Sequence, residues 1–275
     1  MSASPQGLSF LKKLDRPALI AMIHVGALPG TPRCAKSVAE LCRDAVTEAK
    51  MLARAGVDAI MLENMHDAPY LNRSVGPEIV AAMTAICSAV RAEVSLPLGL
   101  QILAGANREA VAVAFAADFQ FIRCEGFVFA HVADEGLMPE ADAGPLLRYR
   151  RIIGAQRIAI LADIKKKHAA HALTADVDLA ETARAAVFSG ADAVIVTGTA
   201  TGRPANADDV ASVADAVDEP VLAGSGVTPE NLASIAAFAD AAIIGSYLKK
   251  NGLWENGPDP RRVKAMVKAI RQCRK

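Results

Sequence analysis

The sequence predicts a single (β/α)8 barrel, an α/β fold, and three observations carry that prediction. Short apolar runs alternate along the whole chain with segments of helical periodicity, which indicates a parallel sheet, and eight rounds of alternation indicate closure into a barrel. The 275 residues suit one barrel of ordinary size. The composition is 52% hydrophobic but only 4% aromatic, so the core consists mainly of small and branched aliphatic side chains. We expect one domain over residues 1–275, with residues 1–16 as an N-terminal extension.

The expected strands are apolar runs that end in small or polar residues. The first is a continuous run of the kind found when both faces of a strand are buried. Two intervening segments place their apolar residues on one helical face. The strands are expected at residues 18–24, 57–63, 96–103, 119–124, 157–163, 193–197, 220–223 and 241–245. The two apolar helix faces are Ile79, Met83, Ile86, Cys87 and Val90, and Val263, Met266, Val267 and Ile270.

Composition and charge exclude several classes of partner. The chain has 30 basic and 30 acidic residues and no long basic run, so we expect neither nucleic acid nor an anionic membrane as partner. No apolar run is long enough to span a bilayer, and no signal peptide is visible before residue 17. Five scattered cysteines without a CxxC pair are typical of reduced thiols. We expect a cytoplasmic protein that forms a homo-oligomer.

The last two expected strands each end in glycine and serine. Such residues allow backbone N–H groups to approach a ligand, and a following helix directs its positive dipole end to the same place. In barrels, the loops after strands seven and eight bind phosphate in this way. Thr228 is expected as a helix N-cap and Pro229 as the first helical residue. Both glycine turns could alternatively be ordinary tight connections. The predicted phosphate-binding residues are Gly224, Ser225, Gly226, Gly245 and Ser246.

Polar residues occur where the expected strands end, which is the mouth of a barrel. A buried ring of such residues would cost several kcal/mol unless its members were paired or served a ligand. Simpler explanations exist: one histidine could hydrogen-bond a neighbouring loop, and Arg123 could form a structural ion pair with Glu63. The residues at these ends are His24, Glu63, Gln101, Arg123, Asp163 and Thr197.

Asp163, Lys165 and Lys167 form the densest polar cluster. Alternation along an extended segment would direct all three to one side. An acid and a lysine held in this way can transfer protons next to a carbonyl, and a lysine can alternatively form a Schiff base with a ketose or aldose. Three consecutive lysines could also be a solvated loop. We assign Asp163 as the base and a lysine to stabilise developing charge, while His24 or Glu63 holds hydroxyls or a metal.

The loop after the second expected strand offers further polar groups. Glu63, Asn64 and Asp67, together with Asp163, could hold a divalent ion such as magnesium, although the spacing does not establish a metal site. A small-residue loop at 197–203 could bind a second polar group of the ligand. No other cofactor is indicated. The expected substrate-binding residues are Asn64, Asp67, Arg123, Thr197 and Gly198.

Several motifs together resemble the BtpA/SgcQ family. They are IHVGALPGTP at 23–32, LENMHDAPY at 62–70, FIR at 121–123, ADIKKKH at 162–168, VTGTATG at 196–202, and the GSGVTPEN and GSYLKKNG segments near the end. The resemblance implies a phosphate-binding TIM barrel. The founding member is linked to photosystem I accumulation in cyanobacteria, and other members lie among sugar-metabolism genes, so the family implies the fold more firmly than a reaction.

Two departures from the family pattern leave the substrate open. After the third strand many relatives read N-V-L-R-N, whereas residues 101–107 here read QILAGAN. The asparagine that usually follows F-I-R is replaced by Glu125, after Cys124. Both changes fall at positions that we expect to face the ligand.

Three functions follow from these observations. The leading hypothesis is an enzyme that isomerises, epimerises or cleaves a phosphorylated sugar or related metabolite. The second is a non-catalytic assembly factor of the photosystem I biogenesis type, which would need an exposed apolar patch, for which Leu253 and Trp254 are the only candidates. The third is a nucleoside or nucleotide enzyme that binds the ribose phosphate. A small anionic ligand is common to the first and third.

Overall fold

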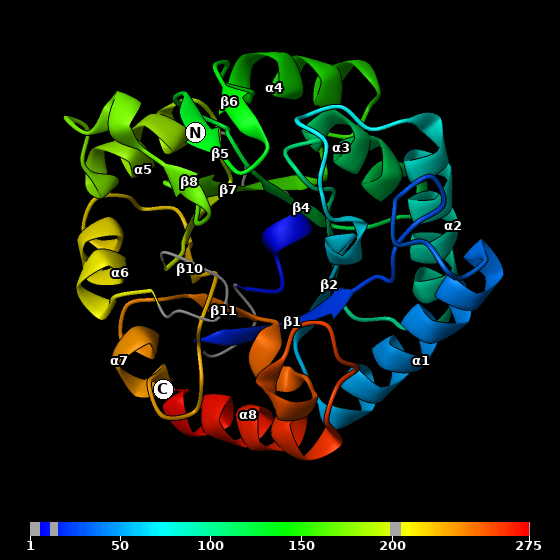
Figure 1. Cartoon of the computed structure of the whole chain (residues 1–275). Helices are drawn as coiled ribbons and strands as arrows, with labels where there is room; N and C mark the ends of the chain where they lie inside the picture. The colour runs from blue at the N-terminus through cyan, green and yellow to red at the C-terminus, as the bar shows by residue number, and fades with distance from the viewer. Residues whose placement is uncertain (1–5, 12–15, 199–204, 275) are drawn as a thin grey trace.

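Eight parallel strands close into a barrel in the computed structural model, which describes residues 6–11, 16–198 and 205–274. Neighbouring strands around the barrel follow one another in the chain, and the last pairs with the first. Figure 1 looks along the barrel axis and shows the helices as an outer ring. The predicted (β/α)8 fold is thus confirmed. The barrel strands are β1 (Ala18–His24), β2 (Ala59–Glu63), β3 (Leu98–Gln101), β4 (Phe121–Cys124), β7 (Ala159–Ile164), β9 (Ala193–Val196), β10 (Val221–Ala223) and β11 (Ala241–Ile244).

The helices bury one apolar face against the barrel, and the two faces predicted from the sequence are buried in α2 and α8. The first helix starts at a capping box, in which the Ser37 and Glu40 side chains satisfy each other's backbone N–H. The α-helices are α1 (Val38–Ala55), α2 (Pro77–Glu93), α3 (Asn107–Ala116), α4 (Ala143–Ile152), α5 (Leu179–Phe188), α6 (Ala207–Ala214), α7 (Leu232–Ala236) and α8 (Pro260–Cys273). Short 3-10 helices are η1 (Gln6–Leu8), η2 (Met65–Asp67), η3 (Ala172–Thr174), η4 (Ser246–Leu248) and η5 (Lys250–Gly252).

The predicted start of the helix after β10 is wrong. Thr228 and Pro229 lie in a turn, and α7 begins only at Leu232. The Asn231 side chain accepts the Thr228 N–H at 2.8 Å and donates to the Gly226 carbonyl at 2.9 Å. The Thr228 carbonyl also accepts the Leu232 N–H at 3.0 Å, so one helical turn precedes the helix itself. The delayed start leaves α7 with only five residues.

Alternation along the strands separates two cores. In β1, Ile20 and Met22 belong to the cluster inside the barrel, whereas Leu19 and Ile23 pack outward against the helices. The next inward position of β1 is therefore its last residue, at the mouth. The barrel interior is filled up to this level by apolar side chains, so polar groups gather only at the strand ends.

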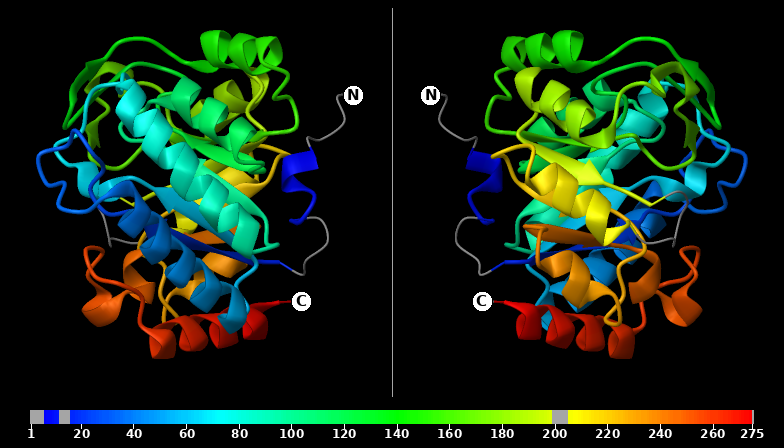
Figure 2. Two further views of the ribbon diagram at one scale, coloured as in Figure 1. Left: turned by 90° about the vertical axis from the view of Figure 1, so that its right-hand side faces the viewer. Right: turned by 90° about the vertical axis from the view of Figure 1, so that its left-hand side faces the viewer.

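The predicted N-terminal extension is in part a plug of the barrel. Leu8, Phe10 and Leu11 are buried and join the cluster inside the barrel. The Phe10 ring stacks on that of Phe121, with centroids 5.9 Å apart. Figure 2 shows this segment at the end of the barrel opposite the long loops. Among the described residues, no helix is long and apolar enough to cross a membrane.

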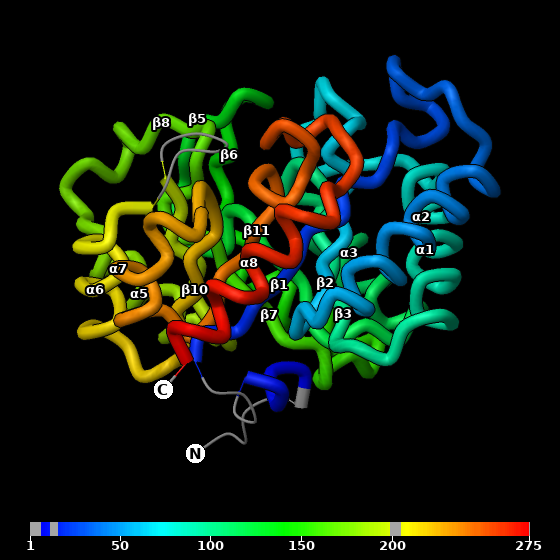
Figure 3. Tube along the Cα trace, turned by 90° about the horizontal axis from the view of Figure 1, so that it is seen from below, coloured from blue at the N-terminus to red at the C-terminus, as the bar shows by residue number. Residues whose placement is uncertain are grey.

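A small antiparallel sheet joins two loops at the mouth. The loop after β4 forms the hairpin β5 (His131–Ala133) and β6 (Gly136–Met138), and the loop after β7 adds β8 (Ala169–Ala170) to β5. Figure 3 shows this sheet at the end of the molecule opposite both chain termini.

Candidate functional site

The strand ends place a layer of polar side chains above the apolar barrel interior. His24 is in register with Glu63, and Glu63 with Gln101, so all three lie at one level on β1, β2 and β3. Arg123 and Asp163 occupy the next inward positions after Phe121 and Leu161. The structure therefore brings the polar residues predicted at the strand ends to the mouth, but only some of them line a cavity there.

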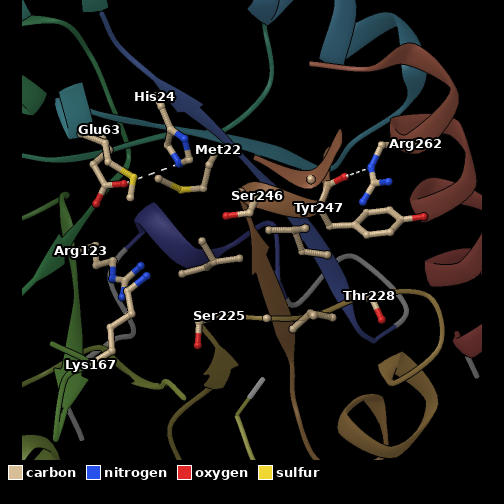
Figure 4. A pocket seen from close by; sticks show the side chains of 18 residues that line it. Met22, His24, Glu63, Arg123, Lys167, Ser225, Thr228, Ser246, Tyr247 and Arg262 are labelled. Carbon is tan, nitrogen blue, oxygen red and sulfur yellow. Dashed lines mark hydrogen bonds and ion pairs between the residues drawn. The ribbon is translucent and has the colours of Figure 1, made fainter. Parts of the chain in front are cut away.

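A cavity of about 160 Å³ opens beside this layer. Figure 4 shows Glu63, Arg123 and Lys167 at one end of it, and Thr228, Tyr247 and Arg262 at the other. The two ends differ in chemistry: one has ionisable side chains, and the other is largely backbone from the loops after β10 and β11. Of the predicted site residues, the cavity is lined by His24, Glu63, Arg123, Lys167, Gly224, Ser225, Gly226, Gly245 and Ser246.

The backbone end requires glycine at two positions. A Cβ at Gly245 would lie 3.0 Å from Nε2 of His24, and one at Gly224 would lie 2.4 Å from the Ile195 side chain. Within the described residues, the backbone N–H groups of Gly226, Val227, Ser246 and Tyr247 have no hydrogen-bond acceptor. Unpaired N–H groups at a cavity wall suit an anion. The expected contribution of a helix dipole is absent from this geometry, because α7 is short and starts late.

Arg262 adds a positive charge at this end, and the sequence reasoning missed it. Its Nε donates to the Tyr247 carbonyl at 2.5 Å, and its guanidinium lies 4.3 Å from the Tyr247 ring centroid. It belongs to the first turn of α8, directly after Pro260 and Arg261. Cations are disfavoured at a helix N-terminus, so two arginines there are a signal that could have indicated a nearby anion site.

Ser225 and Gly198 connect two loops. The Gly198 N–H donates to the Ser225 hydroxyl oxygen at 2.7 Å, which joins the loop after β9 to the loop after β10. Thr197 accepts the Lys167 N–H at 3.1 Å and so holds the loop after β7. The rest of the small-residue loop, residues 199–203, lies outside the described residues.

Arg123 and Asp163 form a buried ion pair with two hydrogen bonds. The Nε–Oδ2 distance is 2.8 Å and the Nη2–Oδ1 distance is 3.0 Å. The Asp163 side chain is 0% exposed and that of Arg123 is 5% exposed. The Asp163 carboxylate is therefore engaged by Arg123 and does not line this cavity, and Arg123 pairs with Asp163 rather than with Glu63. Arg123 still lines the cavity, and its Nη1 has no hydrogen bond in the described part of the chain.

His24 and Glu63 lie side by side at the mouth. Nδ1 of His24 lies 2.9 Å from the Trp254 carbonyl, which can only accept, so this nitrogen carries the proton. Burial, followed by the charge of Lys249, lowers the pKa of His24 to about 3. The neutral ring then has an unprotonated Nε2, 3.8 Å from the Glu63 carboxyl and too far for a hydrogen bond. Burial raises the pKa of Glu63, which favours a protonated carboxyl.

The three consecutive lysines point to three different places, so Asp163, Lys165 and Lys167 do not all share one side as expected. β7 ends at Ile164, and Lys165 has a left-handed φ of +44°, which breaks the alternation. The Lys165 ammonium donates to the Thr174 carbonyl at 2.9 Å. Lys167 turns into the cavity.

Lys166, which the sequence analysis did not assign, is buried between two glutamates. Its Nζ lies 3.1 Å from the Glu125 carboxylate and 3.9 Å from that of Glu135. Glu125, the residue that departs from the family pattern, therefore faces a lysine of the neighbouring loop. A buried glutamate opposite a buried lysine requires tertiary contacts that no sequence spacing reveals.

Asn64 and Asp67 are bound within loops and do not line the cavity. The Asn64 side chain donates to Asp67 at 2.8 Å and accepts the Leu103 N–H at 2.8 Å. Asp67 also accepts the Leu28 N–H at 2.8 Å. The carboxylates suggested for magnesium are thus separated, and the described residues hold no cluster of three or more His, Cys, Asp or Glu side chains suited to a metal.

Comparison with known structures supports the fold. The (S)-3-O-geranylgeranylglyceryl phosphate synthase of Thermoplasma acidophilum, solved with its substrate sn-glycerol-1-phosphate, superposes with a TM-score of 0.60 at 16% identity and covers 99% of each chain. The phosphoribosyl anthranilate isomerase of Thermus thermophilus gives a TM-score of 0.57 at 13% identity, over 94% of this chain and all of that one. Both likenesses are of fold alone.

Several proteins are much more similar to this chain in sequence than the two solved structures are. An uncharacterized mitochondrial protein of Caenorhabditis elegans is 42% identical over 268 residues, 96% of each chain. The photosystem I biogenesis protein BtpA of Synechocystis is 35% identical over 92% of this chain and 87% of its own. A sequence model described as the BtpA family matches residues 15–272. The chain belongs to the BtpA family.

Proposed function

We propose that this protein is an enzyme that isomerises, epimerises or cleaves a phosphorylated sugar or a related small metabolite. The observation that carries the proposal is the unlike chemistry of the two ends of one cavity. Unpaired backbone N–H groups and Arg262 lie at one end, and Glu63, Arg123 and Lys167 at the other. A small phosphorylated metabolite has the same division, with its anion at one end and its carbonyl or hydroxyls at the other.

The geometry favours particular roles for the side chains at the second end. Glu63, whose pKa is raised by burial, carries the proton between substrate atoms, because a carboxyl group with a raised pKa holds and releases a proton more readily than an ordinary one. The unprotonated Nε2 of His24 accepts a hydrogen bond from a substrate hydroxyl. The unpaired Nη1 of Arg123 donates to an oxygen on which negative charge develops. Asp163 positions Arg123.

The phosphate end is tested by thermal shift with inorganic phosphate, glycerol phosphate, ribose 5-phosphate and nucleotides, each with and without magnesium. A ligand at a hundred times its Kd stabilises the folded state by about 2.7 kcal/mol. Arg262→Gln removes one charge-assisted contact and weakens binding by about tenfold. The matched control is Arg261→Gln, one residue away with a side chain 94% exposed, and it keeps the wild-type affinity. Equal affinity in both variants would place the anion elsewhere.

The proton-transfer role is tested separately. Glu63→Gln keeps the shape of the side chain and lowers turnover of any substrate found by about 10² or more, while binding persists. A variant that retains full turnover removes Glu63 from the chemistry.

An assembly role of the kind that the Synechocystis relative's name states is the second candidate. One observation favours it: the apolar side chains Phe188 and Ile152 are 94% and 80% exposed, at the carboxyl ends of α5 and α4. Trp254, which the sequence analysis considered exposed, is instead partly buried against His24 and His66. This role becomes the leading hypothesis if the wild type neither binds nor converts any phosphorylated metabolite in the panel above.

A further inference from the structure

The amines of the three consecutive lysines differ in their hydrogen bonds and ion pairs, and Lys167 differs from the other two. Lys165 is hydrogen-bonded to the Thr174 carbonyl, and Lys166 is paired with Glu125 and lies near Glu135. Among the described residues, the Lys167 amine has neither a hydrogen bond nor an ion pair, and it lines the cavity. A solvated lysine without a partner is ordinary, but one that lines an enclosed site is available for chemistry.

The backbone around Lys167 holds the amine in this place. Lys165 and His168 both have left-handed φ values, +44° and +56°, so the chain turns sharply on either side. Between them, the Lys167 N–H donates to the Thr197 hydroxyl at 3.1 Å, which fixes its backbone to the loop after β9. The side chain thus starts from a fixed point at the cavity wall, as a positioned nucleophile requires.

The surroundings of Lys167 combine a weakened base with a nearby acid. Burial, followed by the charge of Arg123, lowers the pKa of the Lys167 amine, while Glu63 and Asp163 act in the opposite direction. A larger fraction of the amine is therefore neutral, and so nucleophilic, than for a lysine in water. Glu63 lines the same cavity, and burial raises the pKa of its carboxyl, which favours its protonated form.

We propose that Lys167 forms a covalent imine with a phosphorylated aldehyde or ketone, because its amine is unpaired, lines the cavity, and shares it with Glu63 and the anion-binding end. This inference rests on the proposed function, which places the phosphate against the loops after β10 and β11. The carbonyl carbon then faces the opposite end of the cavity, where Lys167 lies.

The step balances with the groups present. The neutral Nζ of Lys167 adds to the carbonyl carbon, and Glu63 gives its proton to the carbonyl oxygen and takes one from the nitrogen, which leaves a carbinolamine. Glu63 then protonates the hydroxyl group, the carbon–oxygen bond breaks, and water leaves. The products are an iminium ion on Lys167, the Glu63 carboxylate beside it, and one water molecule. The iminium withdraws electrons from the adjacent carbon, which eases removal of a proton or cleavage of a carbon–carbon bond there.

The experiment is reductive trapping on the full chain. The protein is incubated with glyceraldehyde 3-phosphate, dihydroxyacetone phosphate or ribose 5-phosphate, reduced with sodium borohydride, and analysed by intact mass and peptide mapping. We expect a single adduct on the peptide containing Lys167, and at least tenfold less of it when inorganic phosphate competes. Lys167→Met and Lys167→Arg abolish the adduct. Lys165→Arg, which keeps the bond to Thr174, is the matched control and retains it.

Three outcomes overturn the proposal in distinguishable ways. If glycerol phosphate raises the melting temperature but no carbonyl compound is trapped on Lys167, the imine is refuted and the phosphate site stands. If the adduct forms equally in Lys167→Arg, another lysine reacts and the assignment is wrong. If no phosphate ester binds to the wild type, the proposed function fails together with the imine. Lys167→Arg keeps the positive charge, so its melting temperature shows whether loss of the adduct reflects loss of the fold.

Discussion

The buried pair of Arg123 and Asp163 gives a sharp prediction about stability. Asp163→Asn keeps the shape of the side chain but leaves the Arg123 charge without its carboxylate, in a place where the two side chains are 5% and 0% exposed. Breaking a buried ion pair from one side costs about 3–5 kcal/mol. The amide oxygen can still accept one of the two hydrogen bonds, and the Glu125 carboxylate also acts on Arg123 with negative charge. We therefore expect a loss at the lower end, about 3 kcal/mol.

Urea unfolding followed by tryptophan fluorescence measures this loss, since Trp254 is the single tryptophan of the chain. The matched control is Glu181→Gln, which breaks an exposed pair with Arg184 at 3.0 Å and should cost less than about 1 kcal/mol. In a double variant, Arg123→Met with Asp163→Leu, both charges leave together, so the loss should be smaller than for Asp163→Asn alone.

Equal stability of Asp163→Asn and the control variant would show that the buried pair does not stabilise the fold by this amount. If Asp163→Asn has wild-type stability but no turnover, the Asp163 carboxylate acts on the substrate, as the sequence alone suggested. Its pairing with Arg123 would then contribute little to the stability of the fold.

Two further predictions concern pH and the barrel plug. Because the pKa of His24 falls from 6.5 to about 3 on folding, the unfolded chain binds a proton below pH 6.5 that the folded chain does not. Between these two pH values, the free energy of unfolding should therefore fall with decreasing pH by about 1.4 kcal/mol per pH unit more in the wild type than in His24→Asn. Urea unfolding at a series of pH values measures this fall, and equal slopes in the two proteins would disprove the neutral ring. Phe10→Ala should lower the free energy of unfolding by about 3 kcal/mol, since it empties the stacked position under Phe121; an unchanged melting temperature would show that residues 6–11 do not close the barrel.

The parts of the site that depend only on strand periodicity could be predicted from the sequence. In parallel strands, residues at the carboxyl ends meet at one edge, so His24, Glu63 and Arg123 had to lie together once the strands were recognised. The glycines at 224 and 245 follow from the same logic, because an inward Cβ at either would meet a neighbouring side chain.

The remaining parts depend on contacts that periodicity does not encode. The start of α7 at Leu232 accompanies bonds from the Asn231 side chain to the backbone of Thr228 and Gly226, which strand and helix periodicity do not reveal. The direction of Lys167 depends on a left-handed residue at 165, a conformation that lysine seldom adopts. Arg262 reaches the site from a helix that sequence analysis treated only as a covering element. Assembly into a homo-oligomer stays a prediction.

The pairing of β8 with β5 makes one unit of two loops that are far apart in the chain. The loop with the three lysines shares backbone hydrogen bonds with the loop that carries Glu125 and Glu135, and the Lys166 amine lies close to both glutamates. A substitution that reshapes one loop therefore has to be accommodated by the other. In laboratory evolution or loop grafting between relatives, the segments 125–138 and 165–170 should be exchanged together. If only one segment were exchanged, its strand would lack a matching partner strand and its buried charge would lack the opposite charge of the other loop.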